Sequence, residues 1–264
     1  MGGVRRSAPE TGQEERQELM RKIAVITSKG GTGKTTTAIN LGHGLALCGK
    51  RVLIVDCDAQ RNVAISFDIQ GRKTLCDLLQ YGEVDVIEVR KNLFVIDSGG
   101  RELAETEMVL AGRSSRERRL ELSLKNLKGC DVVICDCSPT INLININAIA
   151  YADDVIIPVS MDYLAQAGAR QTMQVVDEIN AHSSSNTGIM GILPTFYDAR
   201  TKLSKEVLAA LRERFGNVVF ETVIRVNTSL REAPSFNQTI FEYSPMSRGA
   251  ADYYQLTEEF LTRG

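Results

Sequence analysis

The chain has 264 residues, of which 43% are hydrophobic, and its formal net charge is -2. This length and hydrophobic content are enough to bury a full core in one α/β domain or in two smaller ones. The slightly negative charge excludes a globally basic nucleic-acid binder, so any contact with a polyanion must be regional. No run approaches the ~20 apolar residues of a membrane span, and we expect a soluble, cytoplasmic protein.

Residues 1–20 are polar and charged, with many Glu, Gln, Arg and Gly residues. Such a composition favours a mobile tail or a frayed helix over a packed segment. We therefore expect residues 21–264 to form the folded part of the chain, as a single domain.

Beyond this tail, short β-branched runs alternate with longer helical patterns, which is typical of βαβ units and a parallel sheet. Strands are predicted at 22–27, 51–56, 93–97, 131–136, 154–159, 188–195 and 218–224. Helices are predicted near 34–48, 74–80, 102–127, 142–151, 165–181, 202–214 and 247–262. Several strands are continuously apolar, as expected when helices cover both faces of the sheet. The order predicts an α/β fold with a central, mostly parallel, twisted sheet.

The first predicted strand leads into Ser-Lys-Gly-Gly-Thr-Gly-Lys-Thr-Thr at residues 28–36. Between a strand and a helix, this sequence is typical of the phosphate-binding loop of a P-loop NTPase, whose backbone N–H groups face an anion. Lys34 would bring an ammonium group to the phosphates, and Thr35 a hydroxyl group to Mg²⁺. The predicted nucleotide-binding residues are Gly30, Gly31, Thr32, Gly33, Lys34, Thr35 and Thr36.

The entrance of this loop departs from the general pattern, which has Gly where Ser28 stands. A second lysine, Lys29, follows Ser28. A lysine so early in the loop points away from the phosphate cradle of its own chain, or toward a phosphate that belongs to another molecule.

Aspartates stand at the ends of two predicted strands, where ligands bind in sheets of this kind. Asp56 and Asp58 follow the strand 51–56, and Asp136 closes the strand 131–136. Such a carboxylate is costly to bury unless it meets a cation or a donor. We expect Asp136 to hold a water molecule bound to Mg²⁺, and Asp58 to orient or deprotonate the attacking water. Asp56 would support the metal shell or the loop.

The six cysteines lie mostly within apolar runs and lack the paired C-x-x-C spacing of a zinc site. We expect buried, reduced thiols. An iron–sulfur role for Cys135 and Cys137, which flank Asp136, is the alternative.

Taken together, these segments resemble the deviant-Walker-A ATPases, a family that includes ParA, Soj and MinD. The matching segments are residues 29–36, 56–60 and 133–139, followed downstream by residues 196–201, 231–235 and 247–250. The resemblance covers the chain from residue 22 onward, and its last three segments are similar to the ParA and Soj branch in particular.

The resemblance implies an ATP-dependent homodimer in which two subunits enclose two nucleotides. Lys29 of each subunit would reach the phosphates of the other, so that assembly and hydrolysis become coupled. The implied cofactors are ATP and Mg²⁺. The expected catalytic residues are Lys29, Lys34 and Asp58, and the expected metal site comprises Thr35, Asp136 and Asp56.

In the ParA branch the ATP-bound dimer binds DNA nonspecifically, and a ParB-like or cargo-adaptor protein stimulates hydrolysis. The basic family position that carries over is Arg200. A second family arginine aligns with Ser229, and Arg225 and Arg231 flank that site. The expected DNA contacts are therefore Arg200, Arg225 and Arg231. A further basic cluster lies within residues 113–128, a pattern that also fits a solvated helix face.

Two other branches of the superfamily are alternatives. A MinD-like protein would bind membranes through a C-terminal amphipathic helix rich in Lys and apolar residues. The C-terminal segment here contains Glu258, Glu259 and little basic charge, so no membrane partner is expected. A metabolic or metal-carrier ATPase would need surface cysteines shared across a dimer. The cargo itself, whether plasmid, chromosome origin or protein organelle, is chosen by the partner.

Overall fold

A seven-stranded sheet runs through the centre of the protein, in the order β3-β4-β2-β5-β1-β6-β7. The computed structural model describes residues 20–263. All neighbouring strands are parallel except β3 and β4, which form an antiparallel pair at one edge. The strands are β1 (Arg21–Val25), β2 (Val52–Cys57), β3 (Ile87–Arg90), β4 (Leu93–Ile96), β5 (Val132–Cys137), β6 (Asp154–Ser160) and β7 (Gly188–Thr195).

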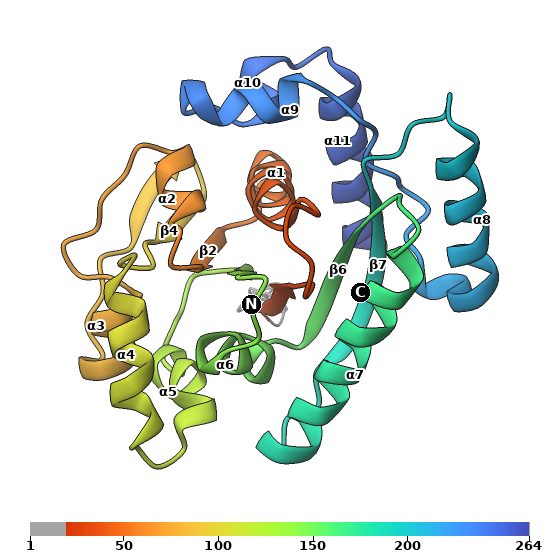
Figure 1. Cartoon of the computed structure of the whole chain (residues 1–264). Coiled ribbons are helices and arrows are strands. Elements are labelled where there is room, and N and C mark those ends of the chain that lie inside the picture. The colour runs from red at the N-terminus through yellow and green to blue at the C-terminus, as the bar shows by residue number, and fades with distance from the viewer. Residues whose placement is uncertain (1–19, 264) are drawn as a thin grey trace, which may run out of the picture.

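Helices cover both faces of this sheet, which makes three layers (Figure 1). One face carries α1 (Lys34–Leu47), α2 (Asn62–Ser66), α9 (Ser229–Glu232), α10 (Ile240–Tyr243) and α11 (Arg248–Thr262). The other carries α3 (Leu75–Tyr81), α4 (Glu102–Ala111), α5 (Arg119–Leu124), α6 (Leu143–Tyr151), α7 (Ala165–Ser183) and α8 (Lys202–Phe215). Short 3₁₀ turns are η1 (Arg116–Arg118), η2 (Gly216–Val218) and η3 (Ala233–Phe236).

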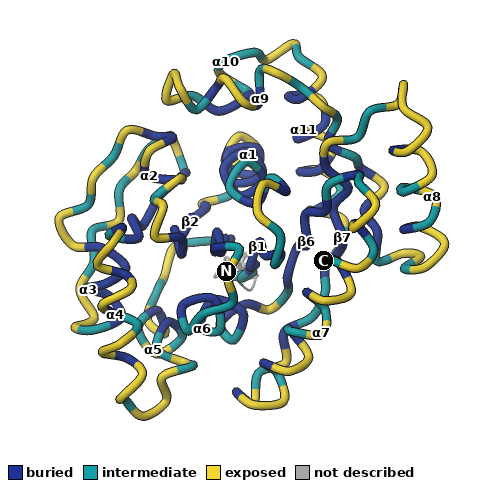
Figure 2. The backbone as a smooth tube through the Cα atoms, in the orientation of Figure 1, coloured by how far each residue is buried: buried dark blue, intermediate teal, exposed yellow. Residues whose placement is uncertain are grey.

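Each layer of helices packs on its own hydrophobic cluster, and the sheet separates the two clusters. Figure 2 shows the central strands as a continuous buried region, while exposed backbone lies on the outer helices and loops. Every residue of β2 and of β5 is buried. This burial on both sides explains why these strands are apolar without alternation.

The predicted fold is confirmed, and six of the seven predicted strands are present within about two residues of their expected bounds. The predicted polar tail, residues 1–20, lies outside the described residues except for Met20. The short elements β3, α2, α9 and α10 were not predicted, because a periodic pattern over four or five residues is too short to tell a helix or a strand from a loop.

The predicted strand 218–224 is wrong. The segment runs beside β7 but forms only one isolated bridge with it, between Ile192 and Val219. A second bridge, between Tyr197 and Arg225, lies just beyond the ends of both segments. Two hydrogen bonds connect it to β7, from the Phe220 amide to the Ile192 carbonyl and from the Ile224 amide to the Pro194 carbonyl. Because Pro194 has no N–H group, it donates nothing in return, and a regular ladder does not form.

The predicted single helix 102–127 is also wrong, since it is divided into α4, η1 and α5. The break follows Gly112, which caps α4, and includes Ser115 in the left-handed region with φ 53°. Gly and Ser are weak helix formers, and a left-handed residue ends the helical hydrogen bonding.

Candidate functional site

A glycine-rich loop joins β1 to α1 and forms one wall of a cavity of about 390 Å³. Gly31 and Gly33 have φ values of 72° and 91°, a region that side chains other than Gly rarely adopt. The Lys34 ammonium donates to the Lys29 carbonyl at 3.2 Å, so its side chain folds back across the loop. The cavity is lined by Gly30, Gly31, Gly33, Lys34, Thr35, Thr36, Asp58, Gln60, Asn62, Pro139 and Phe196. All the predicted loop residues except Thr32, which is buried, therefore face one space.

Asp136 lies beneath this loop, in register with Asp56 on β2 and Val25 on β1. Its side chain is completely buried, and neither carboxylate oxygen has a hydrogen-bond partner among the described residues. Burial raises the pKa of Asp136 to about 7, although the neighbouring Thr35 hydroxyl and Lys34 ammonium lower it. A buried carboxylate without a partner is costly, and a cation with its bound water would relieve that cost.

These features fit Mg²⁺, a hard cation that prefers oxygen ligands and is usually held by one or two protein groups together with substrate phosphates. The Thr35 hydroxyl and the Asp136 carboxylate are the protein groups that would hold it. Within residues 20–263, no group of three or more His, Cys, Asp or Glu side chains is arranged to hold a metal. That finding gives no support to the iron–sulfur alternative for Cys135 and Cys137, both of which are buried in β5.

Asp56 is buried like Asp136, but its oxygens have partners. They accept hydrogen bonds from the backbone N–H groups of Asp58, Val63 and Ala64, at 3.1, 3.2 and 3.5 Å. Burial and the nearby Asp136 carboxylate raise the pKa of Asp56. These contacts favour support of the loop between β2 and α2, while a role for Asp56 at the metal stays a prediction.

Asp58 lies at the rim of the phosphate cavity, and its Oδ1 accepts from the Gln60 amide at 3.0 Å. Gln60 and Asn62 line the same cavity. Neither was among the predicted site residues, although both follow the strand-end aspartates directly. Their position after a strand was the signal that could have included them.

The second loop lysine, Lys29, lies on the outside of the loop and is not among the residues that line the phosphate cavity. Its ammonium group forms an ion pair with Asp162 and approaches the Ser160 hydroxyl at 3.5 Å. Asp162 follows β6, and these contacts lower its pKa against the effect of burial. The expectation that Lys29 points away from its own cradle agrees with this placement.

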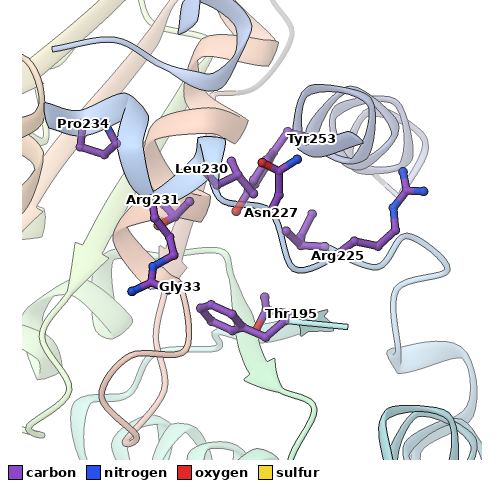
Figure 3. Close-up of a pocket in the computed structure, with 11 residues that line it drawn as sticks. Gly33, Thr195, Arg225, Asn227, Leu230, Arg231, Pro234 and Tyr253 are labelled. Atoms are coloured by element: carbon purple, nitrogen blue, oxygen red, sulfur yellow. The ribbon is translucent and has the colours of Figure 1, made fainter. Parts of the chain in front are cut away.

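A second cavity, of about 290 Å³, adjoins the first and shares Gly33, Thr36 and Phe196 with it. Figure 3 shows Asn227, Leu230 and Arg231 on one side of it, with Thr195 across from them and Gly33 near the end of the Arg231 side chain. The remaining lining residues are Ile224, Arg225, Pro234 and Tyr253. A mostly apolar pocket with a few polar groups, placed beside a phosphate site, fits the base and ribose of a nucleotide. The sequence alone did not predict these contacts.

The three predicted DNA contacts lie in different surroundings. The Arg225 guanidinium forms a paired hydrogen-bonded contact with the buried Asp252, which raises the pKa of Arg225. Arg200 is highly exposed and pairs with Asp198, whose pKa it lowers to about 2. Arg231 is exposed and lines the second cavity. Arg200 is thus more exposed than Arg225, and the DNA role of all three arginines stays a prediction.

The basic cluster within residues 113–128 is largely occupied by local contacts. Arg116 pairs with Glu117, and Arg118 pairs with Glu121. Arg113 donates to the Gln80 carbonyl, and Arg119 to the Leu79 carbonyl. The contacts of Arg113 and Arg119 fasten the segment after α4 and the start of α5 to α3, which favours a structural role for these arginines.

Comparison with known proteins agrees with this geometry. A family model described as an AAA domain matches residues 20–189. The chain is 39% identical over 251 residues to the sporulation initiation inhibitor protein Soj of Bacillus subtilis, covering 92% of this chain and 98% of that protein. It is 38% identical to the chromosome-partitioning ATPase Soj of Thermus thermophilus, covering 92% and 96%. It is 35% identical to the chromosome partitioning protein ParA of Caulobacter vibrioides, covering 92% and 95%.

Solved structures share the fold. Cobyrinic acid a,c-diamide synthase of Mycobacterium smegmatis, with a bound ATP analogue and magnesium, superposes with a TM-score of 0.79 at 28% identity, covering 92% of this chain and 95% of that one. Apo McdA of Cyanothece superposes with a TM-score of 0.81 at 23% identity, covering 91% and 99%.

Proposed function

We propose that this chain, which belongs to the Soj and ParA family of chromosome-partitioning ATPases, hydrolyses ATP with Mg²⁺ and uses the hydrolysis cycle to position a cargo. The observation that carries the proposal is the unpartnered Asp136 carboxylate beneath the phosphate-binding loop. The adjoining 290 Å³ pocket supports a nucleoside triphosphate over a simple phosphate.

Different residues would bind the phosphates, bind Mg²⁺ and activate the attacking water. The amides of residues 30–36 and the Lys34 ammonium would hold the phosphates, and Thr35 and Asp136 would hold Mg²⁺. Mg²⁺, when bound, neutralises charge on the β- and γ-phosphates. Asp58 orients the attacking water or accepts its proton, from a loop that Asp56 holds in place. The protein thereby supplies position and charge compensation, which are the main requirements of phosphoryl transfer.

Dimerisation would complete the site through Lys29. In the single subunit its ammonium group is paired with Asp162, outside the phosphate cavity. In the dimer, Lys29 would leave Asp162 and contact a phosphate of the nucleotide bound to the second subunit. Its positive charge would then reach that nucleotide only when the dimer is closed. Hydrolysis would then depend on assembly, and loss of the γ-phosphate would release the dimer.

The ATP-bound dimer would bind DNA nonspecifically, and a ParB-like or cargo-adaptor protein would stimulate hydrolysis. Phosphate contacts require only Lys or Arg side chains on one face. Arg200, whose side chain is 87% exposed, is the contact that we favour. The protein would then act in the cytoplasm, on the nucleoid.

A MinD-like membrane role has less support. No helix within residues 20–263 has both the length and the apolar character needed to cross a membrane. The C-terminal helix α11 is amphipathic, but its apolar residues Tyr253, Leu256 and Phe260 are buried in the core against α1. An apolar face that is already packed is not available for a membrane surface.

DNA binding with ATP, with ADP and without nucleotide tests the proposal. We expect DNA binding only with ATP, and a steep decrease between ~50 and ~200 mM salt. Asp58→Ala should prolong the DNA-bound state, because ATP would bind without being hydrolysed. Equal binding in all three nucleotide states, or none with ATP, would contradict the DNA role.

Two charge-removal variants locate the DNA contact. Arg200→Ala should weaken ATP-dependent DNA binding, whereas Lys125→Ala, an exposed position in the other basic cluster, should not. The opposite result would move the DNA face to residues 113–128.

A further inference from the structure

The loop between β2 and α2 carries an arginine in an unusual backbone conformation. Arg61 has φ 56° and ψ 33°, a left-handed conformation that costs a residue with a side chain ~1 kcal/mol or more. Its neighbours on both sides, Gln60 and Asn62, line the phosphate cavity together with Asp58. Arg61 itself is absent from that lining and instead lines a separate cavity together with Asp97. The left-handed turn therefore sends one side chain away while its neighbours face the phosphates.

The Arg61 side chain reaches Asp97, which directly follows the last residue of β4. Nε donates to Oδ1 at 2.9 Å and an Nη to Oδ2 at 2.5 Å, and the same Nη reaches the Ile69 carbonyl at 3.4 Å. Asp97 is 1% exposed. A two-pronged contact between a guanidinium and a carboxylate fixes both groups in direction as well as distance.

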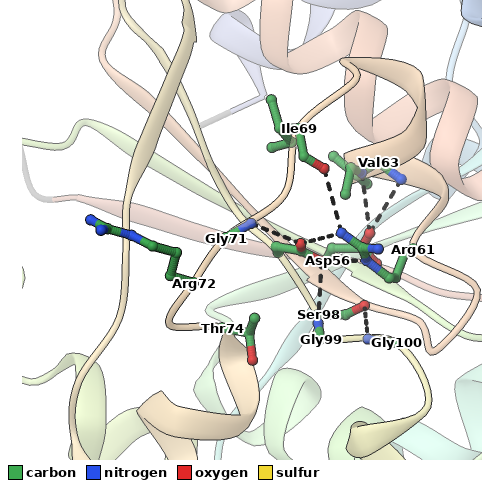
Figure 4. Close-up of polar contacts among 12 residues, drawn as sticks. Asp56, Arg61, Val63, Ile69, Gly71, Arg72, Thr74, Ser98, Gly99 and Gly100 are labelled. Carbon is green, nitrogen blue, oxygen red and sulfur yellow. Dashed lines mark hydrogen bonds and ion pairs between the residues drawn. The ribbon is translucent and has the colours of Figure 1, made fainter.

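Backbone amides hold the carboxylate of this ion pair, and Figure 4 labels Gly71 and Gly99, which carry them. Asp97 also accepts from the amides of Gly71 and Gly99, at 3.1 and 3.2 Å. Gly100 leaves room for the Arg61 side chain, since a Cβ atom there would lie 2.8 Å from Arg61 Cδ. Asp97 is thus fastened to the loop that follows α2, as well as within its own loop.

We propose that Arg61 is a positioning residue for ATP hydrolysis: its ion pair with Asp97 holds the loop 58–62 so that Asp58, Gln60 and Asn62 face the phosphates. The inference rests on the proposed hydrolysis of ATP. Asp56 holds this loop from the sheet side, through the amide of Asp58 and the amides of Val63 and Ala64 just after the loop, and Arg61 holds it from the outer edge. Two anchors at different points fix the direction of the segment, whereas one would leave it free to turn.

The test is Arg61→Gly, which keeps the left-handed backbone without strain and removes the guanidinium. We expect kcat to fall at least about tenfold, while KM and the affinity for a fluorescent ATP analogue change less than about threefold, because misplacement by ~1 Å affects the chemical step most. Amide hydrogen exchange of residues 58–62 should become faster. Arg61→Lys should recover only part of kcat, since an ammonium makes no two-pronged contact. Arg72→Ala is the matched control, because Arg72 lines the same cavity as Arg61 but its side chain is 94% exposed. The kcat of this variant should equal that of the wild type.

A second variant separates positioning from stability. Removal of Arg61 alone leaves Asp97 charged and buried, which also lowers Tm. The double variant Arg61→Gly with Asp97→Asn removes that charge, so we expect Tm to recover and kcat to stay low. Full kcat in either variant would overturn the inference. If the wild type hydrolyses no ATP, the proposed function fails instead, and unchanged exchange of residues 58–62 in Arg61→Gly would then overturn the inference independently.

Discussion

At the scale of single residues, the same side-chain type has different properties in different surroundings. Asp56 and Asp136 are both completely buried at neighbouring strand ends. Asp56 accepts three backbone hydrogen bonds, whereas Asp136 has none. The first therefore supports a loop, and the second is the group that a cation would satisfy.

Because Asp136 is buried without a hydrogen-bond partner among the described residues, we expect the free energy of unfolding to depend on pH. Because its folded pKa is raised from 3.8 to about 7, the folded state binds a proton that the unfolded state releases. The free energy of unfolding is therefore highest below pH ~4, where Asp136 is protonated in both states. It falls as pH rises to about 7, because the unfolded state ionises first. In metal-free buffer, Asp136→Asn should thus gain stability relative to the wild type between pH 4 and 7, by roughly 4 kcal/mol. Urea unfolding at several pH values measures this difference, and a constant difference would contradict it.

Lys29 gives a second prediction at this scale. Lys29→Ala and Lys29→Gln should bind ATP almost normally, because the groups that line the phosphate cavity are unchanged. They should lose stimulated hydrolysis, since the ammonium would act on the partner subunit. Steady-state phosphate release with DNA and adaptor protein measures the loss.

The matched control for Lys29 is Asp162→Asn, which frees the lysine without removing its charge. Hydrolysis should persist in this variant. Full stimulated turnover in the Lys29 variants would refute the cross-subunit role.

At the scale of elements, contacts with neighbouring segments determine whether a segment with the composition of a strand joins the sheet. The segment 218–224 has the composition of a strand, yet it forms only one isolated bridge with β7. Gly191 of β7 allows this approach, because a Cβ atom there would lie 2.5 Å from the Phe220 ring and 2.9 Å from the Val218 carbonyl. The absence of a side chain at Gly191 is thus a condition for packing this edge of the sheet.

Gly191→Ala should destabilise the protein by about 2–4 kcal/mol, because the added methyl group overlaps the Phe220 ring and a carbonyl group that is fixed in place. Gly168→Ala provides the control, since no atom lies within 4 Å of its Cβ position in α7. Alanine in a helix interior should add about 0.5–1 kcal/mol. Urea unfolding of the nucleotide-free protein distinguishes the two, and equal stabilities would refute the steric argument.

At the scale of the whole molecule, the sheet separates two helical layers (Figure 1). The strands β2, β5 and β1 are parallel neighbours, so their carboxyl ends lie side by side at one end of the sheet. The net charge of -2 gives no general attraction to polyanions. Binding to DNA would therefore require a local basic surface that the dimer presents.

The ATP-bound protein should accordingly bind DNA and leave anionic phospholipid vesicles unbound, since the apolar face of α11 is packed on α1. Cosedimentation with vesicles in the presence of ATP measures this. Lys125→Ala and Arg200→Ala should both behave like the wild type in this assay. ATP-dependent sedimentation with vesicles would favour the MinD-like alternative.

Much of this protein follows from local sequence. The alternation of strands and helices, the glycine-rich loop 28–36 and the strand-end aspartates predicted the fold class and the phosphate cavity, because these signals depend on neighbouring residues. The second cavity was not predicted, since its walls come from residues 33–36, 195–196, 224–234 and 253. Residues so far apart in the sequence form no local pattern that would predict a shared pocket.

Sequence by itself predicted which residues bind a phosphate, because that loop is built from consecutive amides and side chains. Only the tertiary structure decided how those residues are held and charged. It paired Lys29 with Asp162, gave Asp56 three hydrogen bonds and Asp136 none, and joined Arg61 to Asp97. The physical reason is that burial and hydrogen bonding depend on groups from distant segments, which meet only when the sheet is assembled.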